Sequence, residues 1–245
     1  MKPALIILAI FVGIASSANL SSQENTPRLT ISHITGDFYV YTTYKLLDGK
    51  PFPSNSAYVL TNKGAVMFDT PWDTTQFQPL LDSIQHRHNK NVVLCIATHY
   101  HNDRTAGLDF LKQKGIRTFS SKLTLDLCKE HHENQAEYYF THDTTFTIGD
   151  RTFQTYYPGE GHTKDNIVLW FADENILYGG CLIKSTESND LGNIADANLA
   201  DWPATIQNVI RRFTKPKYAI PGHFGWADNN GLEHTLQLLQ KKKPE

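Results

Sequence analysis

The chain has 245 residues, with 23 lysines and arginines against 25 aspartates and glutamates, 11 histidines and three cysteines. Charged residues at 20% and aromatic residues at 11% exclude a disordered chain. A near-neutral charge without a basic stripe argues against nucleic acid as a partner. The few, odd-numbered cysteines predict no disulfide framework. The many histidines are the feature that needs an explanation.

The first residues have the pattern of a secretory signal. Lys2 precedes a short apolar run, and small residues then lead to Ala18. The run is shorter than the roughly 20 residues that span a bilayer, which disfavours the alternative of a membrane anchor. We therefore expect residues 1–18 to be a signal peptide for export to the periplasm. Residues 19–245 are expected to form a single, monomeric domain without a membrane anchor.

The segment after the signal is typical of strands. Alternating aromatic and β-branched residues predict strands over residues 37–44, 57–60 and 64–68. Asp48-Gly49 is typical of a hairpin turn, and Leu46 and Leu47 make its tip apolar. Such a tip either packs into the core or stays exposed to bind something.

Helices and strands alternate from residue 74 onward. The spacing of Phe77, Leu80, Leu81 and Ile84 predicts a helix over 74–88. Further helices are expected over 104–114, 123–132, 202–213 and 232–241. Further strands are expected over 92–97, 117–120, 145–148, 152–157, 166–171, 176–178 and 218–220. Strands and then helices, twice over, predict sheets packed inside with helices outside.

The segment from His99 to Gly107 carries the strongest signal for chemistry. His99, His101 and Asp103 follow the end of a hydrophobic strand. Side chains at i, i+2 and i+4 of an extended segment can converge, and imidazole and carboxylate are both ligands of zinc. The alternative is a hydrogen-bonded polar turn, which would be the better interpretation of an isolated His-x-His.

Three more candidate ligands follow predicted strands in the same way. His162, Cys181 and His223 each come after a glycine, which permits a close approach of the backbone. Taken singly, each could be a core histidine or a small buried cysteine. Four such sites at strand ends favour one metal centre instead. The candidate ligands are His99, His101, Asp103, His162, Cys181 and His223.

With these residues the chain resembles the metallo-β-lactamases, in particular the subclass that binds two zinc ions. The resemblance runs from about Leu29 to the final helix and includes Asn55–Tyr58, Asp69–Trp72, Gly161–Thr163, Gly180–Lys184, Leu191–Asn193 and Pro221–His223. It implies an α/β fold of the αββα sandwich type, with two mixed β-sheets flanked by helices. It also implies two Zn²⁺ per chain, one held by His99, His101 and His162 and one by Asp103, Cys181 and His223.

Two positions separate this subclass from its wider superfamily. Thioesterases, lactonases and nucleases of the same fold usually have a histidine directly after the aspartate and an aspartate in place of the cysteine. Here Arg104 follows Asp103, and Cys181 is present. The resemblance then implies that Arg104 lies near the thiolate and that Asp69 supports the site from below.

The resemblance implies hydrolysis of the β-lactam amide of penicillins, cephalosporins and carbapenems, and hence antibiotic resistance. Zinc lowers the pKa of a bound water to about 7, which supplies a hydroxide at neutral pH. In this hypothesis Lys184 holds the substrate carboxylate, Asn193 contacts the substrate and stabilises the developing oxyanion, and Asp103 is the other catalytic residue. The flexible hairpin around Leu46–Phe52, which includes Leu46 and Leu47, closes over apolar substituents.

Two other functions remain open at this point. One is another zinc hydrolase of the same fold, acting on a thioester or lactone; the other is a periplasmic zinc-binding protein without catalysis. Cys95 and Cys128 are expected to be structural thiols, with a disulfide between them as the alternative. Tyr100 and Asn102 are expected to point away from the metals, and the other seven histidines to be solvated.

Overall fold

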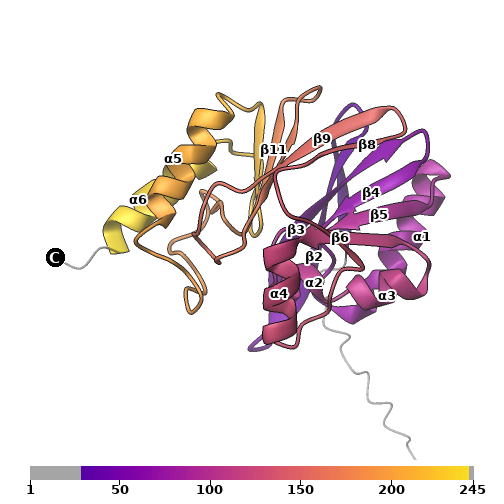
Figure 1. The fold of residues 1–245 in the computed structure, drawn as a ribbon, viewed down its shortest axis with the longest axis horizontal. Helices are drawn as coiled ribbons and strands as arrows, with labels where there is room; N and C mark the ends of the chain where they lie inside the picture. Colours follow the sequence, from indigo (N-terminus) through magenta and orange to yellow (C-terminus); the bar gives the residue numbers. More distant parts are fainter. Residues whose placement is uncertain (1–28, 243–245) are drawn as a thin grey trace, which may run out of the picture.

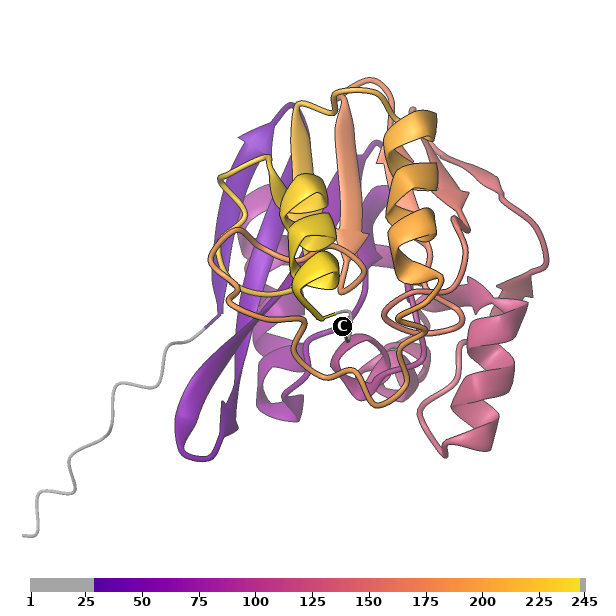
Figure 2. The same cartoon turned by 90° about the vertical axis from the view of Figure 1, so that its left-hand side faces the viewer.

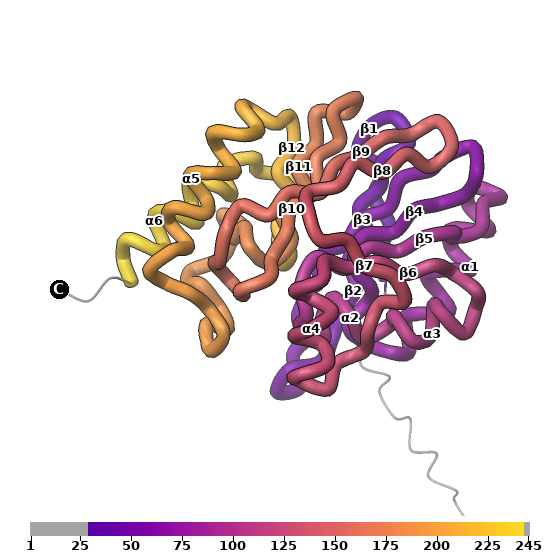
Figure 3. The backbone as a smooth tube through the Cα atoms, in the orientation of Figure 1, coloured from indigo at the N-terminus to yellow at the C-terminus, as the bar shows by residue number. Residues whose placement is uncertain are grey.

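Two β-sheets stack face to face, with helices on both outer sides (Figure 1). The structure is a computed structural model and describes residues 29–242. The expected signal peptide, residues 1–18, lies outside this range. Figure 3 shows that the chain completes the first sheet before it enters the second. The predicted αββα sandwich with two mixed sheets is confirmed.

Within the described residues, seven strands form the first sheet in the order β1 to β7. Their bounds are β1 Thr30–Thr35, β2 Phe38–Leu47, β3 Lys50–Thr61, β4 Gly64–Phe68, β5 Val92–Ile96, β6 Arg117–Ser121 and β7 Tyr138–Phe140. Strands β1 to β4 pair antiparallel, and β4 to β7 pair parallel. Short helical segments follow on this half: η1 Thr74–Gln76, α1 Phe77–His88, α2 Asn102–Thr105, α3 Leu108–Gln113 and α4 Lys122–Glu130.

In the same described range, five strands form the second sheet in the order β12-β11-β10-β9-β8. Their bounds are β8 Thr145–Ile148, β9 Arg151–Tyr156, β10 Val168–Phe171, β11 Ile176–Gly180 and β12 Tyr218–Pro221. Only the β11–β12 pair is parallel. Helices α5 Trp202–Arg212 and α6 Gly231–Lys242 lie on its outer side (Figure 1). None of the helices in residues 29–242 is long and apolar enough to cross a bilayer.

Strand periodicity sorts the apolar side chains into three layers, because successive side chains point to opposite faces. In β4, Val66 and Phe68 enter the core between the sheets, whereas Met67 packs outward against α1 and α3. In β11, Tyr178 faces inward, whereas Leu177 packs outward against α5 and α6. This packing holds the strand ends, and the loops that follow them, in a fixed arrangement.

Most of the predicted elements are present, with three differences. The expected helix over 104–114 is interrupted, because the Gly107 N–H donates to Thr70 Oγ1 at 2.9 Å instead of continuing the helical ladder. A Cβ at Gly107 would lie 3.0 Å from Thr70 Cβ, so glycine permits this close approach. Strands β1 and β7, which the sequence did not predict, extend the two edges of the first sheet.

Candidate metal centre

The six candidate ligands lie on segments that follow strands at one end of the sandwich. His99, His101 and Asp103 follow β5, His162 follows β9, Cys181 follows β11, and His223 follows β12. The two sheets are tied together here, since Ile167 N–H donates to Thr98 O at 3.0 Å and Asn55 N–H donates to Gly222 O at 2.8 Å. The β2–β3 hairpin and the loop between β11 and α5 project at this same end (Figure 2).

Three of the ligands are imidazoles that face one another. The rings of His99, His101 and His162 have pairwise centroid distances of 5.0 Å, and His101 Nδ1 lies 3.2 Å from His162 Nε2. Burial lowers the pKa of His99 and of His162 well below the ordinary value. Both rings are therefore neutral at neutral pH, which is the form that binds a metal.

The other three ligands bring an acid, a thiol and an imidazole together. Cys181 Sγ lies 3.3 Å from Asp103 Oδ2 and 3.2 Å from His223 Nε2, and the latter two atoms are 3.3 Å apart. Burial alone would raise the pKa of Asp103, but Arg104 and His223 outweigh it and hold this pKa well below the usual value. Asp103 is therefore ionised at neutral pH, the form in which a carboxylate binds a metal.

Arg104 lies fully buried beside this second group. Its Nη2 donates to Cys181 Sγ at 3.0 Å and to Gly222 O at 2.9 Å, and its Nε lies 3.0 Å from Asp103 Oδ2. Even so, burial raises the pKa of the Cys181 thiol to about 12. The guanidinium alone does not deprotonate this thiol, whereas a coordinated metal ion does so outright.

Asp69 supports the loop that carries His99. Its carboxylate accepts hydrogen bonds from Thr98 N at 2.7 Å, Thr98 Oγ1 at 2.9 Å and Tyr178 OH at 2.7 Å. Burial raises the pKa of Asp69 to about 6, although Arg104 and these donors favour the ionised form. The residue has a φ of 63°, a strained conformation for a side chain other than glycine. Asp69 thus joins both sheets beneath the ligands.

The donor set fits zinc. All six residues belong to groups whose ligand atoms lie within 4.8 Å of one another. His99 Nε2 is buried without a hydrogen-bond partner among the described residues, so a polar atom is left for a ligand. Separations of 3.2–3.3 Å between Asp103, Cys181 and His223 atoms approach the edge of a zinc tetrahedron, about 3.3–3.7 Å from the usual bond lengths.

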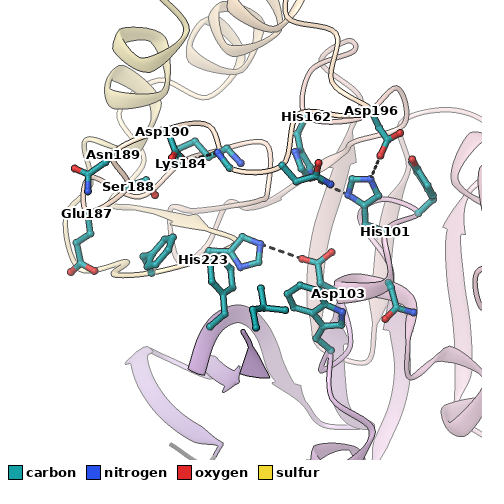
Figure 4. Close-up of a pocket in the computed structure, with 18 of the residues that line it drawn as sticks. His101, Asp103, His162, Lys184, Glu187, Ser188, Asn189, Asp190, Asp196 and His223 are labelled. Carbon is teal, nitrogen blue, oxygen red and sulfur yellow. Dashed lines mark hydrogen bonds and ion pairs between the residues drawn. The ribbon is translucent and has the colours of Figure 1, made fainter. Parts of the chain in front are cut away.

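A cavity of about 780 Å³ opens over these ligands (Figure 4). His101, Asp103, His162 and His223 contribute to its lining. Its remaining wall includes Lys184 and Asn193 and an apolar group that consists of Leu47, Phe52, Trp72 and Phe224. The volume suits a small organic molecule, because ligand pockets usually measure about 300–1,000 Å³.

Of the residues expected to bind substrate, Lys184, Asn193 and Leu47 line this cavity, and Leu46 does not. Asn193 is exposed, and its Oδ1 accepts from Ala195 N at 3.1 Å, which leaves its amide N–H groups free. Strand register explains Leu46: Leu47 pairs with Lys50, so Leu47 shares a face with Phe52, whereas Leu46 points to the opposite face.

Comparison with known proteins identifies the family. Residues 49–223 match the metallo-β-lactamase superfamily. The chain belongs to this superfamily. It is 38% identical to the type 2 metallo-β-lactamase of Elizabethkingia meningoseptica over 241 residues, which cover 98% of this chain and 95% of the relative. It is 41% identical to the metallo-β-lactamase IND-1 of Chryseobacterium indologenes over 209 residues, 85% and 87% of the two chains.

The fold comparison agrees. The solved metallo-β-lactamase of Pontibacter korlensis superposes with a TM-score of 0.85 at 37% identity, over 88% of this chain and 100% of that one. The solved IND-7 enzyme gives a TM-score of 0.84 at 39% identity, over 86% and 98% of the two chains. The identification of a metallo-β-lactamase from the sequence is therefore confirmed.

Sequence reasoning missed several residues at the site of this metallo-β-lactamase. Asp196 Oδ2 lies 3.0 Å from His101 Nε2, and it comes from an exposed loop without any periodic pattern. Trp72 and Phe224, which were not singled out either, complete an apolar wall with Phe52, and the ring centroids of Phe52 and Phe224 are 5.1 Å apart. Phe52 belongs to the hairpin that was expected to close over the substrate, and it pairs with Lys45 on the face that Leu47 shares.

Two further expectations concern residues near the site. Tyr100 and Asn102, which were expected to point away from the metals, line the cavity without belonging to the groups of candidate ligands. Asn102 Nδ2 donates to Glu133 Oε2 at 2.8 Å. Cys95 and Cys128 are buried and unpaired, so the disulfide alternative does not hold.

Proposed function

We propose that this chain hydrolyses the amide bond of β-lactams with two Zn²⁺ held by the six ligands. The observation that supports this most is the convergence of neutral imidazoles, an ionised Asp103 and a buried thiol beside a cavity that a buried lysine also lines. The names of the relatives, metallo-β-lactamases, agree with this substrate class.

The proposed zinc sites differ in their ligands. His99, His101 and His162 would hold the first ion, and Asp103, Cys181 and His223 would hold the second. When bound, zinc lowers the pKa of a coordinated water to about 7 and polarises a carbonyl oxygen. Asp103, ionised and facing the cavity, accepts a hydrogen bond from the attacking water and so orients it toward the lactam carbonyl.

Lys184 binds the carboxylate beside the lactam ring. Its side chain is buried in the cavity wall, and its ammonium lies 5.3 Å from the Trp202 ring. A charge-assisted hydrogen bond to a carboxylate compensates for this burial and orients the substrate. Asn193 has free amide N–H groups at the cavity, and these donate to the oxygen that becomes negative during attack. Leu47, Phe52 and Trp72 contact apolar substituents.

Three finer statements belong to the same proposal and rest on the sequence. The pattern of residues 1–18 supports export to the periplasm and removal of the segment as a signal peptide. The subclass resemblance supports activity on carbapenems in addition to penicillins and cephalosporins. We also infer that the exported form acts as a single-domain monomer.

Hydrolysis of a panel of β-lactams tests the proposal. Purified protein loaded with zinc should open a chromogenic cephalosporin, a penicillin and a carbapenem, lose this activity with a chelator, and regain it when Zn²⁺ is returned. Cleavage of a thioester or lactone with all β-lactams intact would instead favour a different hydrolase. Zinc binding without turnover of any of these compounds would favour a non-catalytic zinc protein.

A further inference from the structure

Four carboxylates besides Asp103 line the cavity. They are Glu133, Glu187, Asp190 and Asp196. Figure 4 shows Glu187 and Asp190 on one side of the metal ligands and Asp196 on the other, with Lys184 between them. Glu187, Asp190 and Asp196 are exposed and Glu133 is half-buried, so the carboxylates form a rim around the opening.

None of these four carboxylates is paired with a lysine or arginine within residues 29–242. Glu133 accepts from Asn102 Nδ2, Glu187 from Gly225 N and Asp190 from Gly192 N, each at 2.8 Å. Asp196 contacts the imidazole of His101 at 3.0 Å. Amides and a metal-binding imidazole satisfy hydrogen bonds without cancelling charge, so the rim carries up to four negative charges.

The centre of the cavity has the opposite sign. Lys184 is 8% exposed, and its ammonium has no hydrogen-bond acceptor among the described residues. It is the one lysine or arginine in the lining of the cavity within the described chain. Metal ions on the six ligands would add to this positive centre. The cavity therefore places a positive centre inside a negative rim.

We propose that this arrangement selects β-lactams that are zwitterionic. Such a substrate places its ring carboxylate on Lys184 and a cationic substituent at the rim. A substrate with a second carboxylate on that substituent is repelled by the rim, since like charges at this range are disfavoured and only partly screened. This inference rests on the proposed β-lactamase activity and adds a preference among its substrates.

Three penicillins that differ at one position test the preference. Ampicillin, benzylpenicillin and carbenicillin share one scaffold and carry an ammonium, a hydrogen and a carboxylate on the same side-chain carbon. At low ionic strength, and at a pH that keeps the ammonium protonated, we expect kcat/KM to fall in that order. Ampicillin should exceed carbenicillin about tenfold, and the ratio should shrink as salt shortens the screening length.

Variants assign the effect to the rim. Glu133→Gln and Asp190→Asn keep the acceptor oxygens for Asn102 and Gly192 and remove two charges. In the double variant the ratio of kcat/KM for ampicillin to kcat/KM for carbenicillin should fall from about tenfold to about threefold. The matched control is Asp82→Asn with Asp173→Asn, which removes two exposed charges from residues outside the cavity lining and should leave the ratio unchanged.

The outcomes separate this inference from the function on which it rests. The preference is overturned if carbenicillin is hydrolysed as efficiently as ampicillin. It is also overturned if the control variant lowers the ratio of the two kcat/KM values as much as the rim variant does. Either result leaves the β-lactamase activity standing. An unchanged ratio in the Glu133→Gln, Asp190→Asn enzyme overturns it as well. If none of the three penicillins is hydrolysed, the proposed function is contradicted, and the preference is contradicted with it.

Discussion

At the scale of single residues, a carboxylate contacts one candidate ligand from the side away from the other imidazoles. Asp196 Oδ2 lies 3.0 Å from His101 Nε2, which leaves His101 Nδ1 directed at His162. Such a carboxylate fixes the tautomer of a metal-binding imidazole and increases its basicity. We therefore expect Asp196 to act through His101, as a positioning residue.

Asp196→Asn tests this role. We expect zinc affinity to fall about 10- to 100-fold, because the amide holds the imidazole less firmly and carries no charge. Competition with a chromophoric chelator measures the affinity. Asp190→Asn is the control, since it lies in the same loop and accepts from Gly192 N without contacting a ligand. An unchanged affinity in Asp196→Asn would show that His101 needs no such partner.

The residues that sequence could predict at the site are those tied to strand ends. His99, His162, Cys181 and His223 each follow a predicted strand, and the structure brings all of them into one cluster. Asp196 and Glu133 escaped prediction because they lie in irregular segments, where position depends on long-range packing instead of periodicity. Their contacts to His101 and Asn102 exist only in the folded chain.

At the scale of elements, the β2–β3 hairpin delivers an apolar side chain to the cavity. Leu47 is 36% exposed and lines the cavity, whereas its neighbour Leu46 is 48% exposed and faces away. Both side chains lie at the end of a long two-stranded arm, which Figure 2 shows projecting beyond the sheet. The arm therefore provides two similar leucines that differ in the face they occupy.

Leu47→Ala should raise KM for a cephalosporin with an apolar substituent about fivefold. The loss corresponds to part of the roughly 1.5–3 kcal/mol available from burying a leucine side chain. Leu46→Ala provides the matched control and should leave KM near the wild-type value. Steady-state kinetics on both variants measures the difference. An equal rise in KM for both variants would contradict the assignment of Leu47 to the cavity.

Helix α1 meets the first sheet through a histidine that is held neutral. Tyr58 OH and His88 Nε2 form a hydrogen bond of 2.8 Å. Burial lowers the pKa of His88, Arg87 and His33 lower it further, and Asp37 opposes them. The unfolded chain therefore binds this proton more readily than the folded one. The resulting stability is present above the ordinary histidine pKa and is lost as the pH falls below it.

His88→Gln tests this contribution, because the glutamine can still accept a hydrogen bond from Tyr58. Urea unfolding at about pH 7.5 and about pH 5.5 should show a smaller loss of unfolding free energy in the variant than in the wild type. His142→Gln, at an exposed position, should behave as the wild type does. If the His88 variant and the wild type lose the same unfolding free energy on acidification, His88 is excluded as the source of the loss.

The elements themselves were largely predictable where periodicity was strong. The 3.6-residue spacing of Phe77, Leu80 and Ile84 predicts α1, and these side chains are buried. Strand β7 was missed because three residues, two of them exposed, carry too little pattern. The interruption at Gly107 was missed because its cause, a hydrogen bond to Thr70, joins distant segments.

At the scale of the whole molecule, we expect the proposed metal centre and the fold to depend on each other. The ligands follow strands of both sheets, and the core between the sheets combines side chains such as Phe68 and Phe171. A ligand that binds only the folded chain stabilises it by mass action. The two sheets should therefore unfold together, and bound metal should oppose their separation.

Thermal unfolding with and without metal tests this coupling. Zinc at about 100 times its Kd adds about 2.7 kcal/mol, which corresponds to a rise of about 5–10 °C in Tm for a chain of this size. His99→Ala removes a buried ligand and should reduce the rise. A Tm that is the same with chelator and with zinc would contradict the expectation that bound metal opposes the separation of the two sheets.

The most direct test of the central claim is a titration of metal-free protein with Zn²⁺ while hydrolysis of a chromogenic cephalosporin and bound metal are measured. We expect the rate to rise from near zero and to saturate at about two equivalents. Cys181→Ser should saturate at about one equivalent with a rate about 100-fold lower, and Cys128→Ser should retain the stoichiometry. A protein that hydrolyses no β-lactam at any zinc level, or whose rate does not depend on zinc, would contradict the account.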